Sequence, residues 1–471
     1  MASNTPMGYL PNETPPPAQL VLLGFQHVLT MFPATVLVAL ITGFHVGTVL
    51  FASGISTIVA LFLSRRGIGK FIPLFYGSSF SYIAAYFAII GAMGGDPSAG
   101  PVSDEILGTM QAGIVATGIL NILVGLLIQK IGKEAIDKVL PPVVTGSVAA
   151  IIGFGLAAAA LNWAAENWVI SLSTLLLTIL FSVYLQNRGF FGMIPVLLGG
   201  VIGYLISWAV APELISFAAV NSAAWLQMPH LTLPIFTGPF VTTAIFSIAV
   251  MAIATIPEST AHLYQISLYV DRFAEERKEK PYALDKHIGI NLILDGIGDF
   301  INGLMGATAG TNYGENNSLM AITRNYSGPA LMAAGGISIL LGFVGKLAEL
   351  VRTVPFAVTG GLAIYLFGVI GMQGIALMQE NKVNMFVPRN LAVGAVIMIV
   401  GIGGNIGFDG GFLPIEFLSG IFPSGLPAIA TAAVLGILMN AVFLIFTPPG
   451  EHVVEAVAGT VKPKTSRTKA K

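Results

Sequence analysis

Charge is what this sequence has least of. Only 10% of its 471 residues are Asp, Glu, Lys or Arg, whereas 55% are hydrophobic. Soluble domains carry about 25% charged residues, so the composition excludes an ordinary water-soluble protein. The mean hydropathy of +0.83 agrees with this. The chain is therefore expected to be a polytopic membrane protein.

Other absences narrow the function. The sequence has no cysteine, which excludes disulfides and metal sites built from thiolates. Residues 1–17 contain no Lys or Arg, so no cleavable signal peptide is expected and the first hydrophobic run is the expected membrane signal. No phosphate-binding loop or nucleotide motif is present, which argues against ATP-driven pumping. The sequence shows no catalytic triad, metal cluster or cofactor loop that would indicate an enzyme. We also expect no nucleic-acid partner.

Hydrophobic segments of about 20 residues are long enough to cross a bilayer as helices. The sequence predicts fourteen of them, seven on each side of a linking loop at 211–237. They lie near 18–42, 47–63, 71–92, 110–130, 142–161, 168–186, 190–210, 239–268, 287–305, 308–326, 329–348, 354–378, 389–407 and 427–447. The third and tenth segments are interrupted by polar residues and glycines, so they are expected to be broken.

The basic residues predict the orientation of these spans. If the N-terminus is cytoplasmic, all but Lys346 and Arg352 of the 22 basic residues fall in cytoplasmic loops or in the basic tail at 451–471. Such a bias is what the positive-inside rule describes. We therefore expect a cytoplasmic (plasma) membrane protein with both termini in the cytoplasm.

The two halves of the chain repeat each other. LPPVVTGSVAAIIG at 140–153 resembles VPFAVTGGLAIYLFG at 354–368, and YGSSFS at 76–81 resembles YGENNS at 313–318. VLFASGISTIV at 49–59 and LILDGIGDFIN at 292–302 form another pair, in the same order. Because each repeat holds an odd number of spans, the halves 1–210 and 238–450 are expected to be inverted relative to each other. Inverted repeats with broken helices are typical of secondary transporters.

The polar segments of the third and tenth spans are the first candidate site. We expect Tyr76 to Ser79, and Tyr313 to Asn316, to be extended strips that pair antiparallel near the midplane. Such strips leave backbone amides for a ligand, and the half-helices that follow add positive dipole ends. The alternative is that both segments are glycine-rich helix kinks.

Ionisable residues inside the predicted spans are the second indication of a functional site. Only four acidic residues fall well inside: Glu258, Asp295, Asp299 and Glu315, together with the histidines His27 and His262. A carboxylate at the bilayer centre costs about 2.5–3.5 kcal/mol on insertion scales, so such residues are functional candidates.

Helical spacing relates several of these residues to one another. Glu258 and His262 are four apart and can pair on one helix face, either as a proton-holding unit or as a structural pair. Asp295 fits a proton relay or a structural hydrogen bond, whereas a structural role is favoured for Asp299. His27 fits either a functional site or a satisfied core position.

These residue types suggest a ligand. Glu258 and Glu315 can accept hydrogen bonds from ligand N–H groups, and strip amides at Ser79, Tyr313 and Gly314 can donate to ligand carbonyls. Phe80 can stack on a flat ring. A planar heterocycle with alternating N–H and C=O groups, such as uracil, meets this set, whereas two carboxylates argue against an anionic substrate.

With these motifs in view, the sequence resembles the nucleobase–ascorbate transporter family, and within it the bacterial uracil permeases. The resemblance rests on FQHVLTMFPATVL (25–37), YGSSFSYI, PESTAHL (257–263), TNYGENNSLMAITR and VTGGLAIYLFGVIG (358–371). The family signature is met by Glu315, Asn316, Thr323 and Arg324, but Ser318 stands where the family usually has Gly. That departure suggests looser packing or altered selectivity.

The resemblance implies further expectations. Glu258 and Glu315 would bind the base, His262 would support Glu258, Phe80 would flank the ring, and Asp295 and His27 match positions that matter for transport. Spans 1–4 and 8–11 would form a core domain, and spans 5–7 and 12–14 a gate domain through which a homodimer forms. The expected activity is proton-coupled uracil import by alternating access, with the proton in place of any cofactor. Sodium coupling, a xanthine or urate permease, and an anion exchanger with a similar repeat are the alternatives.

Overall fold

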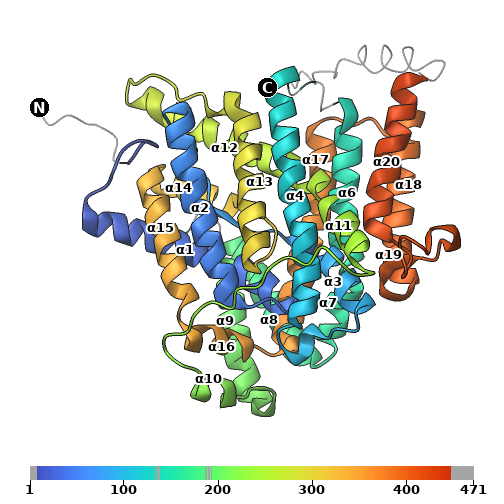
Figure 1. The fold of residues 1–471 in the computed structure, drawn as a ribbon. Helices are drawn as coiled ribbons and strands as arrows, with labels where there is room; N and C mark the ends of the chain where they lie inside the picture. Colours follow the sequence, from blue (N-terminus) through green and yellow to red (C-terminus); the bar gives the residue numbers. More distant parts are fainter. Residues whose placement is uncertain are drawn as a thin grey trace, which may run out of the picture.

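The computed structural model describes residues 8–132, 134, 138–185, 188, 191–192 and 194–446. The basic tail at 451–471 and Lys133 lie outside the described residues. Within them, nine helices are long and apolar enough to cross a membrane, and four shorter apolar helices lie among them (Figure 1). The protein is therefore a mostly helical polytopic membrane protein with a few short strands.

The first half of the chain contains α1 (Pro17–Ile41), α2 (Val46–Ile68), β1 (Tyr76–Ser78), η1 (Phe80–Tyr82), α3 (Ile83–Ala92) and α4 (Asp104–Ile131). It continues with α6 (Pro142–Gly155), α7 (Ala157–Ala164), α8 (Trp168–Tyr184) and α9 (Pro195–Val210). Helices lie at the positions of the expected spans, with the third broken as expected and one difference in the fifth. The third is a strand followed by a short helix, and the fifth divides at Leu156 into α6 and α7.

The second half contains α11 (Val241–Ala249), α12 (Ala252–Glu276), η5 (Leu284–His287), α13 (Ile288–Met305), β2 (Gly310–Asn312), α14 (Gly314–Thr323) and α15 (Gly328–Gly342). It continues with α16 (Gly345–Arg352), α17 (Phe356–Glu380), α18 (Pro388–Met398), the π-helical turn η6 (Ile399–Gly403), α19 (Gly404–Gly407) and α20 (Ala428–Ile445). The linking loop at 211–237 is not wholly irregular, because it holds η4 (Pro212–Leu214) and α10 (Ala218–Ser222).

Four helices pack in two pairs through glycines spaced seven residues apart. A Cβ on any of these glycines would lie within 2.9 Å of the partner backbone, so only glycine permits the approach. On α2 and α15, Gly47 faces Gly342 and Gly54 faces Gly335; on α13 and α4, Gly289 faces Gly125 and Gly296 faces Gly118. The two contacts therefore use the same spacing, and each joins a helix of the first half to a helix of the second.

Packing partners divide the helices into two sets. In one set, α1 and α2 pack on α15, α13 packs on both α2 and α4, and α11 packs on α4. In the other, α17 packs on α6, α7 and α8, and α18 packs on α6 and α20. The two sets meet where α6 of the second set contacts α12, which itself packs on α13 of the first set. α6 also contacts η1.

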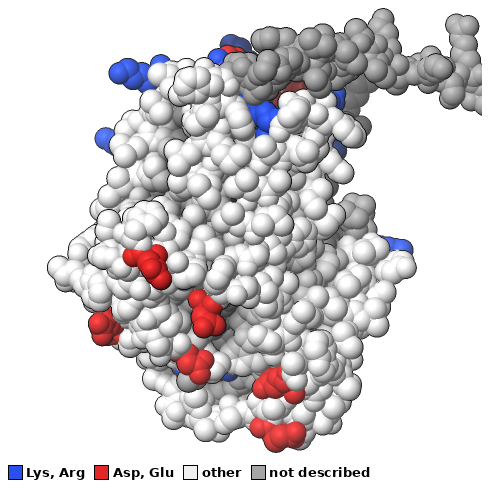
Figure 2. Space-filling model, turned by 90° about the vertical axis from the view of Figure 1, so that its right-hand side faces the viewer, with Lys and Arg blue, Asp and Glu red and all other residues white. Residues whose placement is uncertain are grey.

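Charged side chains are segregated on the surface. Figure 2 shows most of the visible acidic side chains over the lower half of one face, whereas most of the visible basic side chains lie toward its upper end. Membrane helices lie between the two ends, where large apolar side chains such as Leu176, Leu268 and Leu438 are exposed. This pattern is typical of a protein surrounded by lipid and bounded by water on both sides.

Candidate substrate-binding site

The two broken segments meet as a short antiparallel ladder. β1 pairs with β2 in the register Tyr76 with Asn312, Gly77 with Thr311 and Ser78 with Gly310. Ser79 N also donates to Ala309 O at 3.1 Å, and Tyr313 N to Phe75 O at 2.9 Å, so these two amides bond within the ladder and are not left for a ligand as expected. The prediction of paired strands is confirmed, and the alternative of two kinked helices is wrong.

The expected limits of the second strip are wrong. The sequence match of YGSSFS with YGENNS suggested an extended backbone from Tyr313 to Asn316, but β2 ends at Asn312 and α14 begins at Gly314. Tyr313 is the N-cap residue of α14 and makes no side-chain cap. The first amides of α14 therefore point out of the helix end, because first-turn N–H groups lack partners inside a helix.

Asp299 fastens both strands to the scaffold. Its Oδ1 accepts hydrogen bonds from the Tyr76 hydroxyl on β1 and, at 2.8 Å, from the Gly310 amide on β2. Its Oδ2 accepts from Asn121 Nδ2 of α4 at 3.0 Å. Since the side chain is fully buried, these three donors give the carboxylate the partners that burial demands. The structural role favoured for Asp299 agrees with this geometry.

The Tyr313 side chain reaches from the start of α14 to the end of β1 and to α1. Its hydroxyl donates to Ser78 O at 2.8 Å and lies 2.8 Å from Thr35 Oγ1 on α1. The ring lies against Gly77, where an added Cβ would come within 2.6 Å of the ring atoms. The tyrosine thus needs a glycine beneath it, and its buried position makes it a support of the site as well as part of its lining.

A second polar network joins α12 and α13 to β2. Asp295 accepts hydrogen bonds from Ser259 of α12 and from Asn312 Nδ2, the latter at 2.9 and 3.1 Å. Asn291 Nδ2 donates to Ser259 Oγ at 2.7 Å. Asp295 is buried, so it acts on the strand through Asn312 and does not face open space.

His262 faces the strand backbone. Its Nδ1 lies 2.7 Å from Asn312 O, and its Nε2 lies where a Cβ on Gly314 would come within 2.8 Å. His262 therefore makes a contact with the end of β2 that its helical spacing from Glu258 did not predict. His262 joins α12 to the start of α14.

His27 is buried between α1 and α14. Asn316 Nδ2 lies 3.0 Å from His27 Nδ1 and 3.2 Å from His27 O. The histidine is 1% exposed, which agrees with the alternative of a satisfied core position.

The two glutamates differ from the two aspartates in exposure. Glu258 is half-buried and Glu315 is exposed, whereas Asp295 and Asp299 are buried. Glu258 and Glu315 also interact electrostatically, and both interact with Tyr313. The structure therefore brings these two carboxylates together on accessible surface beside the strand ends.

The remaining expected residues are Phe80 and Ser79 near β1 and Ser318 on α14. Phe80 is half-buried at the start of η1, which touches α6, and α6 also touches α12. Ser79 is buried, and its Oγ accepts from Ser81 N at 3.2 Å as the cap of η1. Ser318 is exposed one turn after Glu315 and donates to Gly314 O at 3.1 Å. Phe80 on η1 and Glu258 on α12 thus stand on two elements that both touch α6, and Glu315 and Ser318 stand on α14, which touches α12.

Sequence reasoning missed the residues that hold this arrangement together. Asn312, Ser259, Asn291, Asn121 and Thr35 carry no charge and stand in apolar helices or next to glycines. Polar side chains buried in a membrane protein need hydrogen-bond partners. Uncharged polar residues inside the predicted spans were therefore the sequence signal that could have indicated them. Their partners come from distant parts of the chain, which a single sequence does not reveal.

Comparisons with known proteins agree with the geometry. A protein-family sequence model described as "Permease family" matches residues 18–410 of this chain. The chain is 32% identical over 461 residues to a uracil permease of Escherichia coli K12, covering 94% of this chain and 96% of that one. It is 34% identical over 439 residues to a uracil permease of Bacillus caldolyticus, covering 91% and 93%. A putative pyrimidine permease, RutG of Escherichia coli K12, is 31% identical over 455 residues, covering 94% of both chains.

Solved structures share the fold at low identity. The transmembrane domain of the cyanobacterial bicarbonate transporter BicA aligns with a TM-score of 0.57 at 16% identity, covering 84% of this chain and 98% of that one. Murine solute carrier 26 family member A9, an anion transporter in the inward-facing state, aligns with a TM-score of 0.60 at 13% identity, covering 92% and 69%. Together with the family model and the permease relatives, the strand ladder and its signature residues lead to one assignment: the chain belongs to the permease family known as the nucleobase–ascorbate transporters.

Proposed function

We propose that the chain is a secondary active transporter that imports uracil together with a proton. The observation that carries this proposal is the pairing of two accessible carboxylates, Glu258 and Glu315, beside the end of a two-stranded ladder. The uracil permease relatives support the substrate class. RutG, a putative pyrimidine permease, is compatible with it.

The chemistry of uracil suits this site. The ring has two N–H donors and two carbonyl acceptors, and Glu258 and Glu315 are acceptors on adjacent elements. The first-turn amides of α14, which begins at Gly314, would be donors at a positive dipole end. Phe80 offers an aromatic face at the third side of the site. Tyr313 and Ser79 line and support the backbone that a bound base would touch.

Proton coupling is assigned to Glu258, His262, Asp295 and His27, with the proton as the coupling ion and no cofactor. A base that binds between two carboxylates is favoured when one of them is neutral, because like charges then no longer repel. His262 touches the Asn312 carbonyl, and the Asn312 side chain touches Asp295. These contacts link His262 and Asp295 to β2, the strand beside the site. Sodium is the alternative coupling ion.

The proposed architecture has fourteen spans in two inverted repeats, 1–210 and 238–450. The matching glycine pairs support it, since α2 with α15 and α13 with α4 each join one helix from either half through the same seven-residue spacing. Spans 1–4 and 8–11 would form the core domain, and spans 5–7 and 12–14 the gate. The division of the helices into two packing sets supports that grouping. Alternating access would follow from movement of one set against the other across the surface that α6 shares with α12 and η1.

The protein is assigned to the plasma membrane with both termini in the cytoplasm. The gathering of basic side chains toward one end of the molecule supports that orientation. A homodimer would form through the gate helices, where α8 and α20 expose large apolar side chains. The protein is proposed to act as a permease and not as an enzyme.

Two other functions share this fold. A xanthine or urate permease needs the same ladder with different acceptors, and a Gln at position 315 would favour it. An anion exchanger is suggested by the fold neighbours, whose titles name bicarbonate and anion transport. The two carboxylates disfavour it, because an anion bound between Glu258 and Glu315 would be repelled.

Equilibrium binding of a base panel to the purified protein tests the site. We expect uracil to bind the wild type and Glu315→Gln to lose at least about tenfold in affinity, which corresponds to about 1.4 kcal/mol. Glu213→Gln, an exposed carboxylate on η4, is the matched control and should bind as the wild type does. Unchanged uracil affinity in Glu315→Gln contradicts the assigned site, and tighter binding of xanthine than of uracil by the wild type supports the purine alternative.

A further inference from the structure

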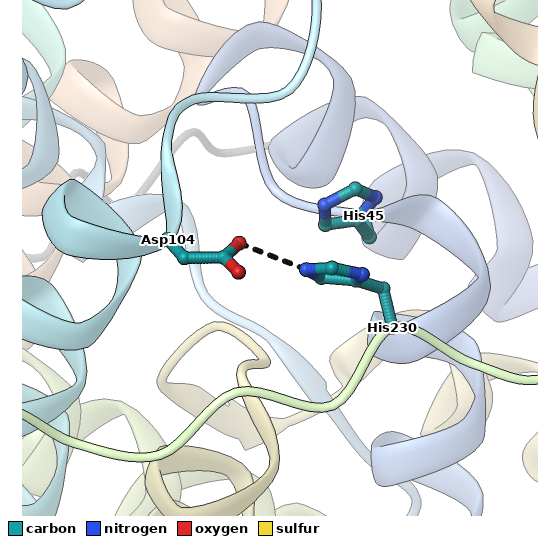
Figure 3. A group of neighbouring side chains, drawn as sticks. All are labelled: His45, Asp104 and His230. Atoms are coloured by element: carbon teal, nitrogen blue, oxygen red, sulfur yellow. Dashed lines mark hydrogen bonds and ion pairs between the residues drawn. The ribbon is translucent and has the colours of Figure 1, made fainter.

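Three metal-ligating side chains converge on the face of the molecule opposite the basic end. They come from three separate segments: His45 from the α1–α2 loop, Asp104 from the start of α4, and His230 from the extended segment 226–235, here called the outer strap (Figure 3). One ligand atom from each lies within 4.8 Å of the other two. Of the residues that the structure describes, no other three His, Asp or Glu meet this condition.

The three side chains already contact one another. His230 Nε2 lies 2.8 Å from Asp104 Oδ1, and the His45 and His230 rings lie against each other, tilted by 36°, with their centroids 4.2 Å apart. The side chains of His230 and Asp104 are 44% and 66% exposed, so an ion reaches them from solvent without any rearrangement of the helices.

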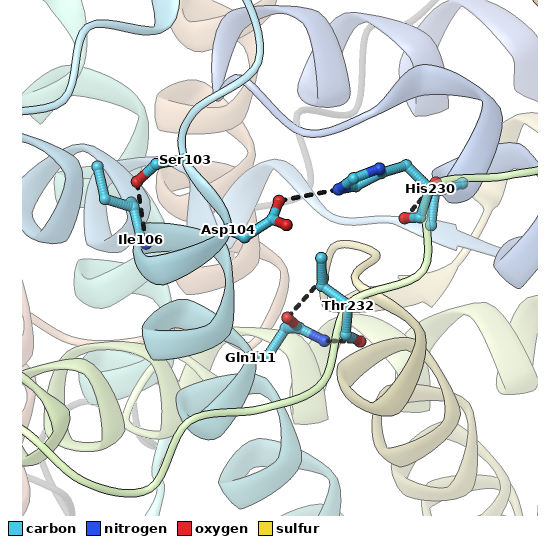
Figure 4. Close-up of polar contacts among 7 residues, drawn as sticks. Ser103, Asp104, Ile106, Gln111, His230 and Thr232 are labelled. Atoms are coloured by element: carbon cyan, nitrogen blue, oxygen red, sulfur yellow. Dashed lines mark hydrogen bonds and ion pairs between the residues drawn. The ribbon is translucent and has the colours of Figure 1, made fainter.

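The backbone beneath each ligand is fixed. Asp104 opens α4, whose first turn is capped by Ser103 through a 3.4 Å bond from Ile106 N (Figure 4). His230 O accepts from Thr48 Oγ1 of α2 at 2.9 Å. His45 is itself the N-cap residue of α2. All three ligands therefore stand at the ends of long helices or are bonded to one.

The outer strap is also held two residues further on. Gln111 Nε2 of α4 donates to Thr232 O at 2.7 Å, and Thr232 Oγ1 donates back to Gln111 Oε1 at 2.8 Å (Figure 4). Ile235 N donates to Gly108 O at 2.8 Å. The His230 side chain thus projects from a strap that is bonded to α4 on one side and α2 on the other.

We propose that His45, Asp104 and His230 bind a transition-metal dication of the zinc class on the solvent-exposed outer face. Two imidazoles and one carboxylate are ligands that zinc accepts at about 2.0–2.2 Å, with water completing a tetrahedron. Ligand atoms in such a tetrahedron lie about 3.3 Å apart, so atoms now within 4.8 Å close by side-chain rotation alone. The ion replaces the direct contact between His230 and Asp104.

The surrounding charges set the strength of the site. Arg352 interacts electrostatically with His45 and opposes a cation, but it is paired with Glu349 at 3.3 Å. Asp104 supplies one negative charge to the site itself. A bound ion would tie the outer strap, which joins the two halves of the chain, to both α4 and the α1–α2 loop. The metal therefore stabilises the folded state by mass action.

Metal titration of the purified full chain tests this proposal. The probes are Zn²⁺, followed by calorimetry and thermal unfolding, and Co²⁺, followed by its visible absorption. We expect one ion per chain and an increase in the unfolding temperature. Asp104→Asn and His230→Asn should each weaken binding at least about tenfold. His287→Asn, on η5 and outside the cluster, is the matched control and should bind as the wild type does.

The variants also separate the proposal from a purely structural cluster. Asp104→Asn keeps an oxygen that accepts from His230, so it is expected to fold, and gel filtration of the variant checks this. If the wild type binds no Zn²⁺, or if both ligand variants bind as tightly as the control, the proposal is overturned and the cluster is only an ion pair beside a stacked ring. Because the readout is metal binding without uracil, its failure leaves the proposed transport function unaffected.

Discussion

Replacing Asp299 tests whether one buried carboxylate holds the strand ladder. Asp299→Ala removes the acceptor of three donors: the Tyr76 hydroxyl, the Gly310 amide and Asn121 Nδ2. A hydrogen bond to a charged group contributes about 1.5–3 kcal/mol, and a buried donor left unpaired adds a cost. The three bonds share one side chain and are not additive. We expect the free energy of unfolding to fall by about 3–5 kcal/mol.

Asp299→Asn should be much milder. Its remaining oxygen accepts from Tyr76 and Gly310, and its new amide group turns a donor toward Asn121. The Asn121 Oδ1 atom is buried without a hydrogen-bond partner in the described structure, so rotation of that amide by half a turn supplies an acceptor. The loss should therefore be about 1–2 kcal/mol, the difference between charged and neutral bonds.

Denaturant unfolding of both variants in the same detergent, together with uracil binding, measures these effects. The expected order of stability is wild type, then Asp299→Asn, then Asp299→Ala, with uracil affinity falling in the same order. If Asp299→Ala unfolds within 1 kcal/mol of the wild type and binds uracil equally well, the ladder does not depend on this carboxylate and the reasoning is wrong.

Three other predictions follow from single contacts. Gly77→Ala should cost about 1–3 kcal/mol and weaken uracil binding, because the new methyl group overlaps the Tyr313 ring; normal binding and stability would contradict the close approach. Ser318→Gly removes the hydroxyl that bonds to Gly314 O, so we expect changed selectivity in a base competition assay with the strand ladder intact, and an unaltered base preference would remove Ser318 from the determinants of selectivity. Burial alone would raise the pKa of Glu13, but hydrogen bonds from Arg277 and the Leu10 amide, and the Arg277 charge, bring that pKa below its usual 4.5. Glu13→Gln should therefore destabilise by about 1 kcal/mol at neutral pH, discounted for partial exposure, and this difference should shrink as the pH falls below 4.5; a difference that stays constant to pH 3 would refute it.

The positions of the helices could be predicted because hydropathy and charge act locally. Runs such as 18–42 and 354–378 correspond closely to α1 and α17, since a segment of that length has one stable state in a bilayer. The pairing of the broken spans could also be predicted from the sequence. Two polar, glycine-containing segments inside a membrane protein must find hydrogen-bond partners for their backbone groups, and each can supply them to the other.

The register of the two strands and the partners of the buried side chains could not be predicted from the sequence. Matching YGSSFS to YGENNS aligned Tyr76 with Tyr313, yet Tyr76 pairs with Asn312 while Tyr313 begins the next helix. A three-residue strand carries too little periodicity to fix its register. His262 illustrates the second limit, because its spacing from Glu258 suggested a pair along the helix but gave no sign of the contact with the Asn312 carbonyl. Contacts between elements depend on packing that helical spacing does not encode.

Uptake of radiolabelled uracil into proteoliposomes tests the central claim most directly. With an inwardly directed proton gradient, the wild type should accumulate uracil above equilibrium, a protonophore should abolish the accumulation, and Glu258→Gln should neither accumulate uracil nor respond to the gradient. Accumulation by the wild type that is unchanged by the protonophore would contradict proton-coupled uracil import through this site.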